Sequence, residues 1–96
     1  MDGGVSQRVT IEPKHDHLIG LADRQATFEY WPCQISQKPD DLAAAGFFHT
    51  QQDDLVECFY CGGQLRSWEA LDDPKNEHIR YYENCLFAKA SAPRCG

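Results

Sequence analysis

Apolar residues recur along this chain with two periods, one typical of helices and one typical of strands. Residues 18–31 predict a first helix that packs its apolar side inward, because their apolar positions lie near helical spacing. These positions are Leu18, Leu21, Phe28 and Trp31. Pro32 ends the predicted helix, since proline lacks the amide hydrogen that a helix interior needs. Residues 32–37 are then expected to form a loop.

Residues 38–47, "KPDDLAAAGF", predict a second short helix. Pro39 suits the first helical position, and Asp40 and Asp41 favour the positive end of the helix dipole. Gly46 can adopt the left-handed conformation that often closes a helix. We therefore expect this helix to begin at the proline and to end at the glycine.

Three further segments predict strands. Residues 47–50, "FFHT", and residues 51–59, "QQDDLVECF", would form two strands around a polar turn, with Val56 and Phe59 directed inward. Residues 64–68, "QLRSW", follow a pair of glycines and alternate polar with apolar side chains. A small sheet is expected from these segments.

A third helix is predicted to begin at Pro74, with Asp73 as its N-cap and Asp72 close to the dipole. Residues 1–17 show no sustained period. The chain is therefore expected to comprise an N-terminal tail, one domain and a C-terminal tail. These three parts are residues 1–17, 18–90 and 91–96.

A chain of 96 residues allows one small domain, in which hydrophobic burial alone leaves a thin stability margin. The net charge of -6 and only nine dispersed Lys and Arg residues argue against nucleic-acid binding. No apolar run approaches a membrane span, and the first residues lack the apolar core of a signal peptide. We expect a soluble cytoplasmic protein, with a nuclear location also open, that binds neither nucleic acid nor membranes.

Four residues in the order C-x2-C-x16-H-x6-C have the spacing of a zinc site. They are Cys58, Cys61, His78 and Cys85. The C-x-x-C turn supplies two thiolates, and the last two ligands stand two helical turns apart on the third predicted helix, so both can face that turn. An odd number of cysteines and the absence of a signal peptide favour a metal over a disulfide framework.

The ordinary alternative for each of the four residues is a buried cysteine or a satisfied histidine. The remaining histidines and cysteines lack spaced partners, and we expect solvated histidines and free thiols. They are His15, His17, His49, Cys33 and Cys95. Four protein donors close the coordination sphere of zinc, so we predict one structural zinc ion and no enzymatic activity. No catalytic triad, P-loop or paired acid motif offers another route to catalysis.

From about Arg24 to Phe87 the chain resembles a BIR domain (baculoviral IAP repeat), the zinc-binding module of the inhibitor-of-apoptosis proteins. The resemblance rests on "RQATFEYWP", "LAAAGFF" and "DDLVECFYCGGQLRSWEALDDPKNEHIRYYENCLF", in this order. It implies an α+β fold, a three-stranded antiparallel sheet with short helices around one zinc. Family members often bind peptides with a free N-terminal alanine beside the third strand, as in processed caspase subunits and death-inducing antagonists.

The resemblance implies a peptide groove on this chain. Its residues would be Gln64, Leu65, Arg66, Ser67, Trp68, Asp72, Glu77 and Tyr81. The first four would pair with an extended peptide through backbone hydrogen bonds. Trp68 would wall the alanine pocket, and Asp72 would receive the α-amino group with Glu77 as a second acceptor. The ordinary reading is that Asp72 complements the helix dipole and Glu77 is solvated.

Three departures from the family pattern indicate weaker or altered selectivity. Gln64 stands where the deepest grooves have glycine, so its side chain would narrow the groove or turn to solvent. Tyr81 replaces a frequent tryptophan, and Ser67 replaces an acid found in some members. The far end of the groove would be lined by Leu55, Val56 and Glu57. Of these, Val56 is expected in the core and the other two at the surface.

The sequence thus predicts an apoptosis-regulating module that binds caspases or their antagonists. One alternative is a reader of the histone H3 tail, although that branch of the family has a long C-terminal dimerisation helix. Another is a structural module with a vestigial groove that contacts a signalling adaptor. Ligase activity would need a RING domain, for which too few Cys and His follow Cys85. Such a domain would belong to a longer parent chain.

Overall fold

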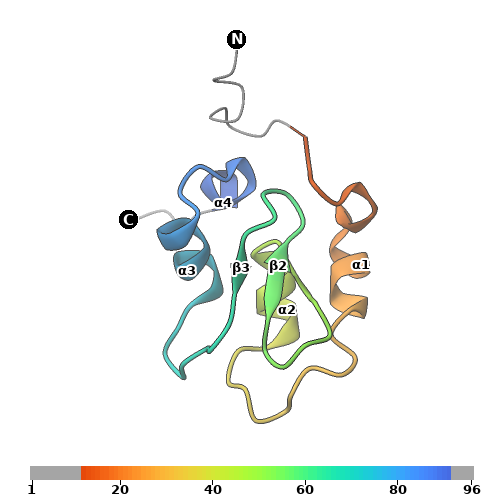
Figure 1. Cartoon of the computed structure of the whole chain (residues 1–96), viewed down its shortest axis with the longest axis vertical. Coiled ribbons are helices and arrows are strands. Elements are labelled where there is room, and N and C mark those ends of the chain that lie inside the picture. The colour runs from red at the N-terminus through yellow and green to blue at the C-terminus, as the bar shows by residue number, and fades with distance from the viewer. Residues whose placement is uncertain (1–11, 92–96) are drawn as a thin grey trace.

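The structure is a computed structural model that describes residues 12–91. Its strands form one antiparallel sheet in the order β1-β2-β3. The strands are β1 Phe47–His49, β2 Val56–Cys58 and β3 Gln64–Leu65. The α+β fold with a three-stranded antiparallel sheet is confirmed. In Figure 1, β3 lies between β2 and the third α-helix.

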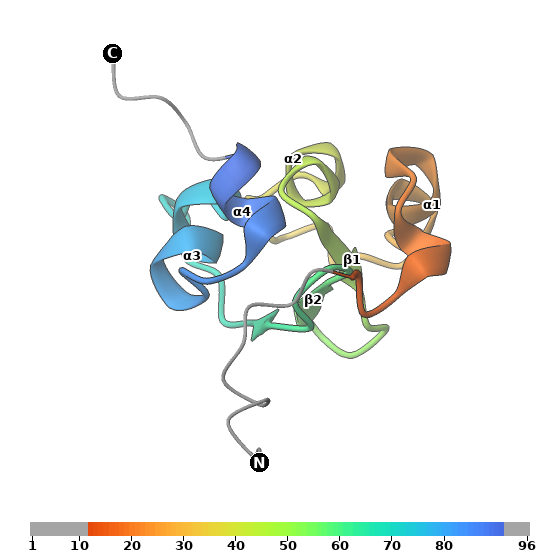
Figure 2. The ribbon, with the colours of Figure 1, turned by 90° about the horizontal axis from the view of Figure 1, so that it is seen from above.

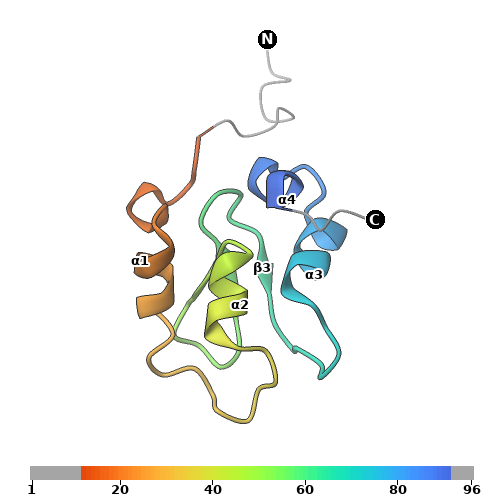
Figure 3. The ribbon, with the colours of Figure 1, turned by 180° about the vertical axis from the view of Figure 1, so that it is seen from behind.

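Short helices surround the sheet. They are the 3-10 helix η2 Asp16–Leu18 and the α-helices α1 Leu21–Ala26, α2 Pro39–Ala44, α3 Pro74–Tyr81 and α4 Leu86–Ser91. Seen from above, α1, α2 and α4 lie on one side of the sheet (Figure 2). The view from behind shows α2 in front of the strands (Figure 3). Among the described residues, no helix has the length and apolar character needed to span a membrane.

The predicted first helix is wrong in extent, because a 3-10 turn and the short helix α1 replace it. The hydroxyl of Thr27 donates to the carbonyl of Arg24 at 2.7 Å, and such a local bond competes with further helix. The chain continues in tight turns that bury Phe28, whereas Leu21 is 46% exposed. Local side-chain bonding therefore overrides the apolar spacing.

The second helix is confirmed. Pro39 occupies its first position, and Gly46 follows its end with a φ of 102°. A Cβ at Gly46 would lie 2.8 Å from the Phe87 ring. This position therefore requires glycine for its backbone conformation and for the close approach of an aromatic side chain.

The strand prediction is confirmed for β1 and β2, with Val56 and Phe59 only 0% and 4% exposed. It is wrong for the length of β3, which ends at Leu65 instead of Trp68. Ser67 has a φ of 62°, and the amide of Trp68 donates to the carboxylate of Asp54 at 2.9 Å. Regular pairing of this segment with β2 therefore ends at Leu65.

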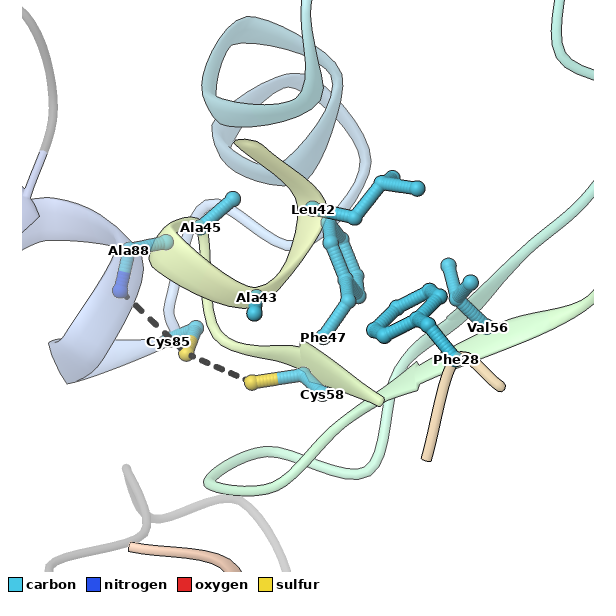
Figure 4. Packing of buried hydrophobic residues seen from close by; sticks show 9 residues of the cluster. All are labelled: Phe28, Leu42, Ala43, Ala45, Phe47, Val56, Cys58, Cys85 and Ala88. Carbon is cyan, nitrogen blue, oxygen red and sulfur yellow. Dashed lines mark hydrogen bonds between the residues drawn. The ribbon is translucent and has the colours of Figure 1, made fainter. Parts of the chain in front are cut away.

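The core lies between the sheet and the helices. Its buried members are Phe28, Leu42, Ala43, Ala45, Phe47, Val56, Cys58, Cys85 and Ala88. Figure 4 shows the sulfurs of Cys58 and Cys85 directed toward each other at the edge of this cluster. Two of the predicted metal ligands, Cys58 and Cys85, thus belong to the hydrophobic core of this small domain.

The outer face of the sheet carries a row formed by Phe48, Glu57 and Gln64, which stand opposite one another in the register. Glu57 was expected at the surface but is 9% exposed. Its carboxylate lies 2.6 Å from the His15 ring and 3.6 Å from the Lys14 ammonium, and it accepts from Gln64 at 3.0 Å. Burial opposes the charged form, but these contacts prevail and lower the pKa of Glu57.

The prediction of solvated histidines is correct for His17, which is exposed, and wrong for the other two. His15 is half-buried because its ring bonds Glu57. His49 is 4% exposed, stacks on Phe28 and bonds the carbonyl of Asp53 at 2.9 Å. Cys33 is a free, exposed thiol as predicted, whereas Cys95 lies outside the described residues.

Candidate functional site

The four predicted metal ligands come together in one cluster, with their donor atoms all within 4.8 Å of one another. The sulfurs of Cys58 and Cys85 are 3.9 Å apart, and the Cys61 sulfur is 3.7 Å from the His78 Nε2. In a tetrahedral zinc site, sulfur–sulfur and sulfur–nitrogen separations are about 3.8 and 3.6 Å. The donor set and its dimensions therefore fit a single structural zinc ion.

Backbone amides orient the two sulfurs of the C-x-x-C turn. The Cys58 sulfur accepts from the amides of Tyr60 and Cys61 at 3.2 and 3.5 Å. The Cys61 sulfur accepts from the amide of Gly63 at 3.3 Å. These bonds stabilise thiolate charge and hold the sulfurs toward the cluster.

The other two ligands come from separate elements. His78 lies on α3, and its Nδ1 bonds the carbonyl of Ala45 at 2.8 Å, which leaves Nε2 directed at the sulfurs. The prediction that Cys85 continues the same helix is wrong, because α3 ends at Tyr81. Cys85 instead precedes α4, where its sulfur accepts from the amide of Ala88 at 3.4 Å.

Close contact between the donors changes their proton affinities. Burial disfavours the charged imidazole, but hydrogen bonds to the sulfurs of Cys61 and Cys85 prevail and raise the pKa of His78 to about 9. Hydrogen bonds to Cys61 and Cys85 raise the pKa of Cys58, whereas those to Cys58 and Cys61 lower that of Cys85. Zinc binding to this cluster would displace the shared protons.

A cavity of about 330 Å³ lies beside β3 and α3. Seven predicted groove residues line it: Leu65, Arg66, Ser67, Trp68, Asp72, Glu77 and Tyr81. Glu69 and Arg80, which sequence reasoning missed, complete the lining. Gln64 does not line the cavity, because its side chain donates to Glu57 on the outer face of the sheet.

Acidic groups dominate the end of the cavity beyond β3. Asp73, and not Asp72, caps α3 by accepting from the amide of Asn76 at 3.0 Å. Asp72 instead accepts from the amide of Glu69 at 2.8 Å through one carboxylate oxygen. The Glu77 side chain is 17% exposed and lies 3.9 Å from the guanidinium of Arg80. The loop before α3 and the first turn of α3 therefore present negative charge to the cavity.

The outer edge of β3 is partly occupied by Tyr82. Its hydroxyl accepts from the Gln64 amide at 3.0 Å and donates to the Gln64 carbonyl at 2.9 Å. A Cβ at Gly63 would lie 2.6 Å from the Tyr82 ring, so this glycine permits the approach. No sequence signal indicated the contact, because it joins the strand to the end of a helix 18 positions away.

Gln37 holds residues 69–72, the acidic loop before α3, through hydrogen bonds. No pattern in the sequence indicated this role. Gln37 is 6% exposed, and its amide nitrogen donates to the carbonyls of Glu69 and Asp72 at 2.7 and 2.8 Å. The indole of Trp31 in turn donates to the Gln37 carbonyl at 3.0 Å. The position of the Asp72 carboxylate therefore depends on a loop more than thirty residues away.

Replacing Gln37 with leucine is expected to lower the free energy of unfolding by about 1–2 kcal/mol, since two carbonyls lose their donor. Amide exchange at Asp72, which bonds the Glu69 carbonyl, should accelerate. Urea denaturation and hydrogen exchange measure both effects. Gln34→Leu is the control, because Gln34 is exposed in the same loop. Equal effects of the two substitutions would contradict the anchoring role.

The fold and the ligand cluster define a small zinc-binding α+β module. The family described as "BIR: Inhibitor of Apoptosis domain" matches residues 24–89, and the chain belongs to this family.

Baculoviral IAP repeat-containing protein 7 of Mus musculus is 51% identical over 83 residues, 86% of this chain and 29% of that protein. The E3 ubiquitin-protein ligase XIAP of Rattus norvegicus is 41% identical over 78 residues, 81% of this chain and 16% of that protein. The chain thus spans less than a third of either relative. The crystal structure of DIAP1 BIR1 bound to a Grim peptide is similar with a TM-score of 0.66 and 37% identity, covering 70% of this chain and 68% of that one.

Proposed function

We propose that this chain is an apoptosis-regulating module that binds peptides with a free N-terminal alanine, from caspases or their antagonists. The observation that carries the proposal is the cavity beside β3, where Trp68 and the carboxylates of Asp72 and Glu77 lie around one space. An aromatic wall suits a methyl side chain, and carboxylates suit an α-ammonium group. A small apolar residue with an uncapped amine satisfies both.

Similarity to DIAP1 BIR1, solved with a Grim peptide, supports a peptide partner of this kind. Some relatives are named E3 ubiquitin-protein ligases, but this chain spans only a minor part of them. Four protein donors at the zinc site leave no position for a reactive water molecule. We therefore assign binding, and no catalytic step, to this chain.

Acetylation of the peptide is expected to weaken binding about 10-fold to 100-fold, the scale of a charge-assisted hydrogen bond. An Ala-initiated tetrapeptide and its N-acetylated twin would be compared by calorimetry. Asp72→Asn should weaken the free peptide and barely change the acetylated one. The amide keeps an acceptor for the Glu69 amide, so the loop is preserved.

Glu83→Gln is the matched control, because Glu83 is an exposed carboxylate that follows α3 and does not line this cavity. It should leave the preference for the free amine unchanged. Equal affinity for the two peptides would refute recognition of the amine.

The contact of Tyr82 with the edge of β3 favours a second candidate, an adaptor-binding module with a vestigial groove. Both Gln64 backbone groups that a guest strand would use are bonded to the Tyr82 hydroxyl. Amide shifts in NMR distinguish the candidates. Shifts at Arg66 and Trp68 on adding the free-amine peptide support the groove, whereas zinc-loaded protein without any groove shift supports the second candidate.

A further inference from the structure

Arg66 places an unpaired positive charge on the wall of the groove. Its side chain is exposed, lines the cavity, and has no hydrogen bond or ion pair with any residue between 12 and 91. The other arginines in that range differ. Arg24 is buried against three carbonyls, and Arg80 lies 3.9 Å from Glu77. Arg66 is thus the groove cation that is available to a ligand.

The sheet register shows which backbone groups of β3 are directed to the free edge. The amide of Cys58 donates to the carbonyl of Gly63 at 2.8 Å, and Val56 stands opposite Leu65. Because residues of an antiparallel strand face its neighbour alternately, Gly63 and Leu65 point to β2, and Gln64 points to the open edge. Arg66 directly follows the last residue of β3, and a guest strand that extends the alternation by one residue would use its amide and carbonyl. The Gln64 amide and carbonyl are already bonded to the Tyr82 hydroxyl.

The acidic end of the cavity sets the direction of the guest peptide. Asp72 and Glu69 follow β3 in the chain and lie beyond its C-terminal end. A guest whose ammonium group is bound there runs antiparallel to β3. The first residue of the guest then lies beyond Arg66, and its second residue lies opposite Arg66. The side chains of Arg66 and of this second residue are then on the same face.

We infer that this groove selects peptides with an acidic side chain at the second position and disfavours lysine or arginine there. The inference rests on the proposed peptide function and specifies its ligand. Opposite charges stabilise a directly opposed pair of residues, and like charges destabilise it. The carboxylates beyond β3 act on the ammonium of the first residue, whereas Arg66 acts on the second side chain.

Three C-terminally amidated peptides, Ala-Glu-Ala-Leu, Ala-Gln-Ala-Leu and Ala-Lys-Ala-Leu, test the inference by calorimetry. The Glu peptide should bind about threefold to tenfold more tightly than the Lys peptide, and the gap should shrink at high salt. Arg66→Glu should reverse the order, and Arg66→Gln should abolish it. A reversed affinity order of the Glu and Lys peptides would show that the charge at position 66 sets the preference. The overall negative charge of the protein would favour the Lys peptide in the wild type and in the variants alike.

Lys89→Glu is the control, because it makes the same change of charge at an exposed position on α4, away from the cavity. It should preserve the order of the wild type. If all peptides bind with the same order in the wild type and in Arg66→Glu, the inference is wrong while the proposed function stands. If even the Gln peptide does not bind to zinc-loaded protein, the proposed function fails, and the inference fails with it.

Discussion

Removing zinc is expected to abolish the cooperative fold. The ligands join β2 and its following turn to α3 and to the segment before α4, so the ion connects three parts of the chain. The binding free energy of a structural zinc in small peptides, about 10–16 kcal/mol near pH 7, is as large as the whole stability of an ordinary domain, about 5–15 kcal/mol. Far-UV circular dichroism during chelation, together with the amount of zinc released, measures the effect.

Cysteine substitutions provide the matched control for chelation. Cys85→Ser removes one donor from the cluster and should greatly weaken zinc binding and folding. Cys33→Ser alters an exposed thiol outside the cluster and should leave both unchanged. An unchanged circular dichroism spectrum after stoichiometric release of zinc would refute the structural role of the metal.

Replacing Arg24 with methionine should lower the free energy of unfolding by about 3–5 kcal/mol. The guanidinium is 4% exposed and donates to the carbonyls of Leu18, Ile19 and Ala43 at 2.7–3.0 Å. It also lies 4.6 Å from the ring centre of Phe59, a cation–π contact worth about 1–2 kcal/mol when desolvated. Burial lowers the pKa of Arg24, but a guanidinium remains charged at neutral pH.

Urea denaturation in excess zinc measures this effect without interference from metal loss. Arg80→Met is the control, because the Arg80 side chain is 69% exposed and its contacts among residues 12–91 are with Glu77 and Tyr81 of its own helix. It should change stability by less than about 0.5 kcal/mol. The stability of Arg24→Lys should be closer to that of Arg24→Met than to that of the wild type. One ammonium group cannot reproduce the planar arrangement of N–H donors with which the guanidinium reaches three carbonyls. Similar losses in Arg24→Met and Arg80→Met would show that the buried charge is unimportant.

Predictions based on neighbouring residues agree with the structure where the physics is local. Asp73 and Pro74 start α3, and Gly46 closes α2, because caps and left-handed turns depend on a few adjacent positions. The C-x-x-C turn likewise forms from its own amides and sulfurs. These features need no distant partner.

Errors occur where a contact across the fold competes with a local pattern. β3 stops early because Trp68 bonds Asp54, which lies in the turn between β1 and β2. Glu57 is buried because Lys14 and His15 cover the outer face of the sheet. His49 is buried against Phe28. None of these partners can be paired from sequence spacing alone.

The sequence by itself determined the zinc ligands, the family, the start of α2 and of α3 and the order of the three strands, because these follow from residue types at short, regular intervals. Only the tertiary structure decided the shape of the cavity beside β3. Gln37 bonds the loop before α3, the Tyr82 hydroxyl bonds the backbone of Gln64 on β3, and Arg66 lines the cavity without a partner among residues 12–91. Each of these features depends on packing between segments far apart in the chain, where a shift of one residue would exchange the partners.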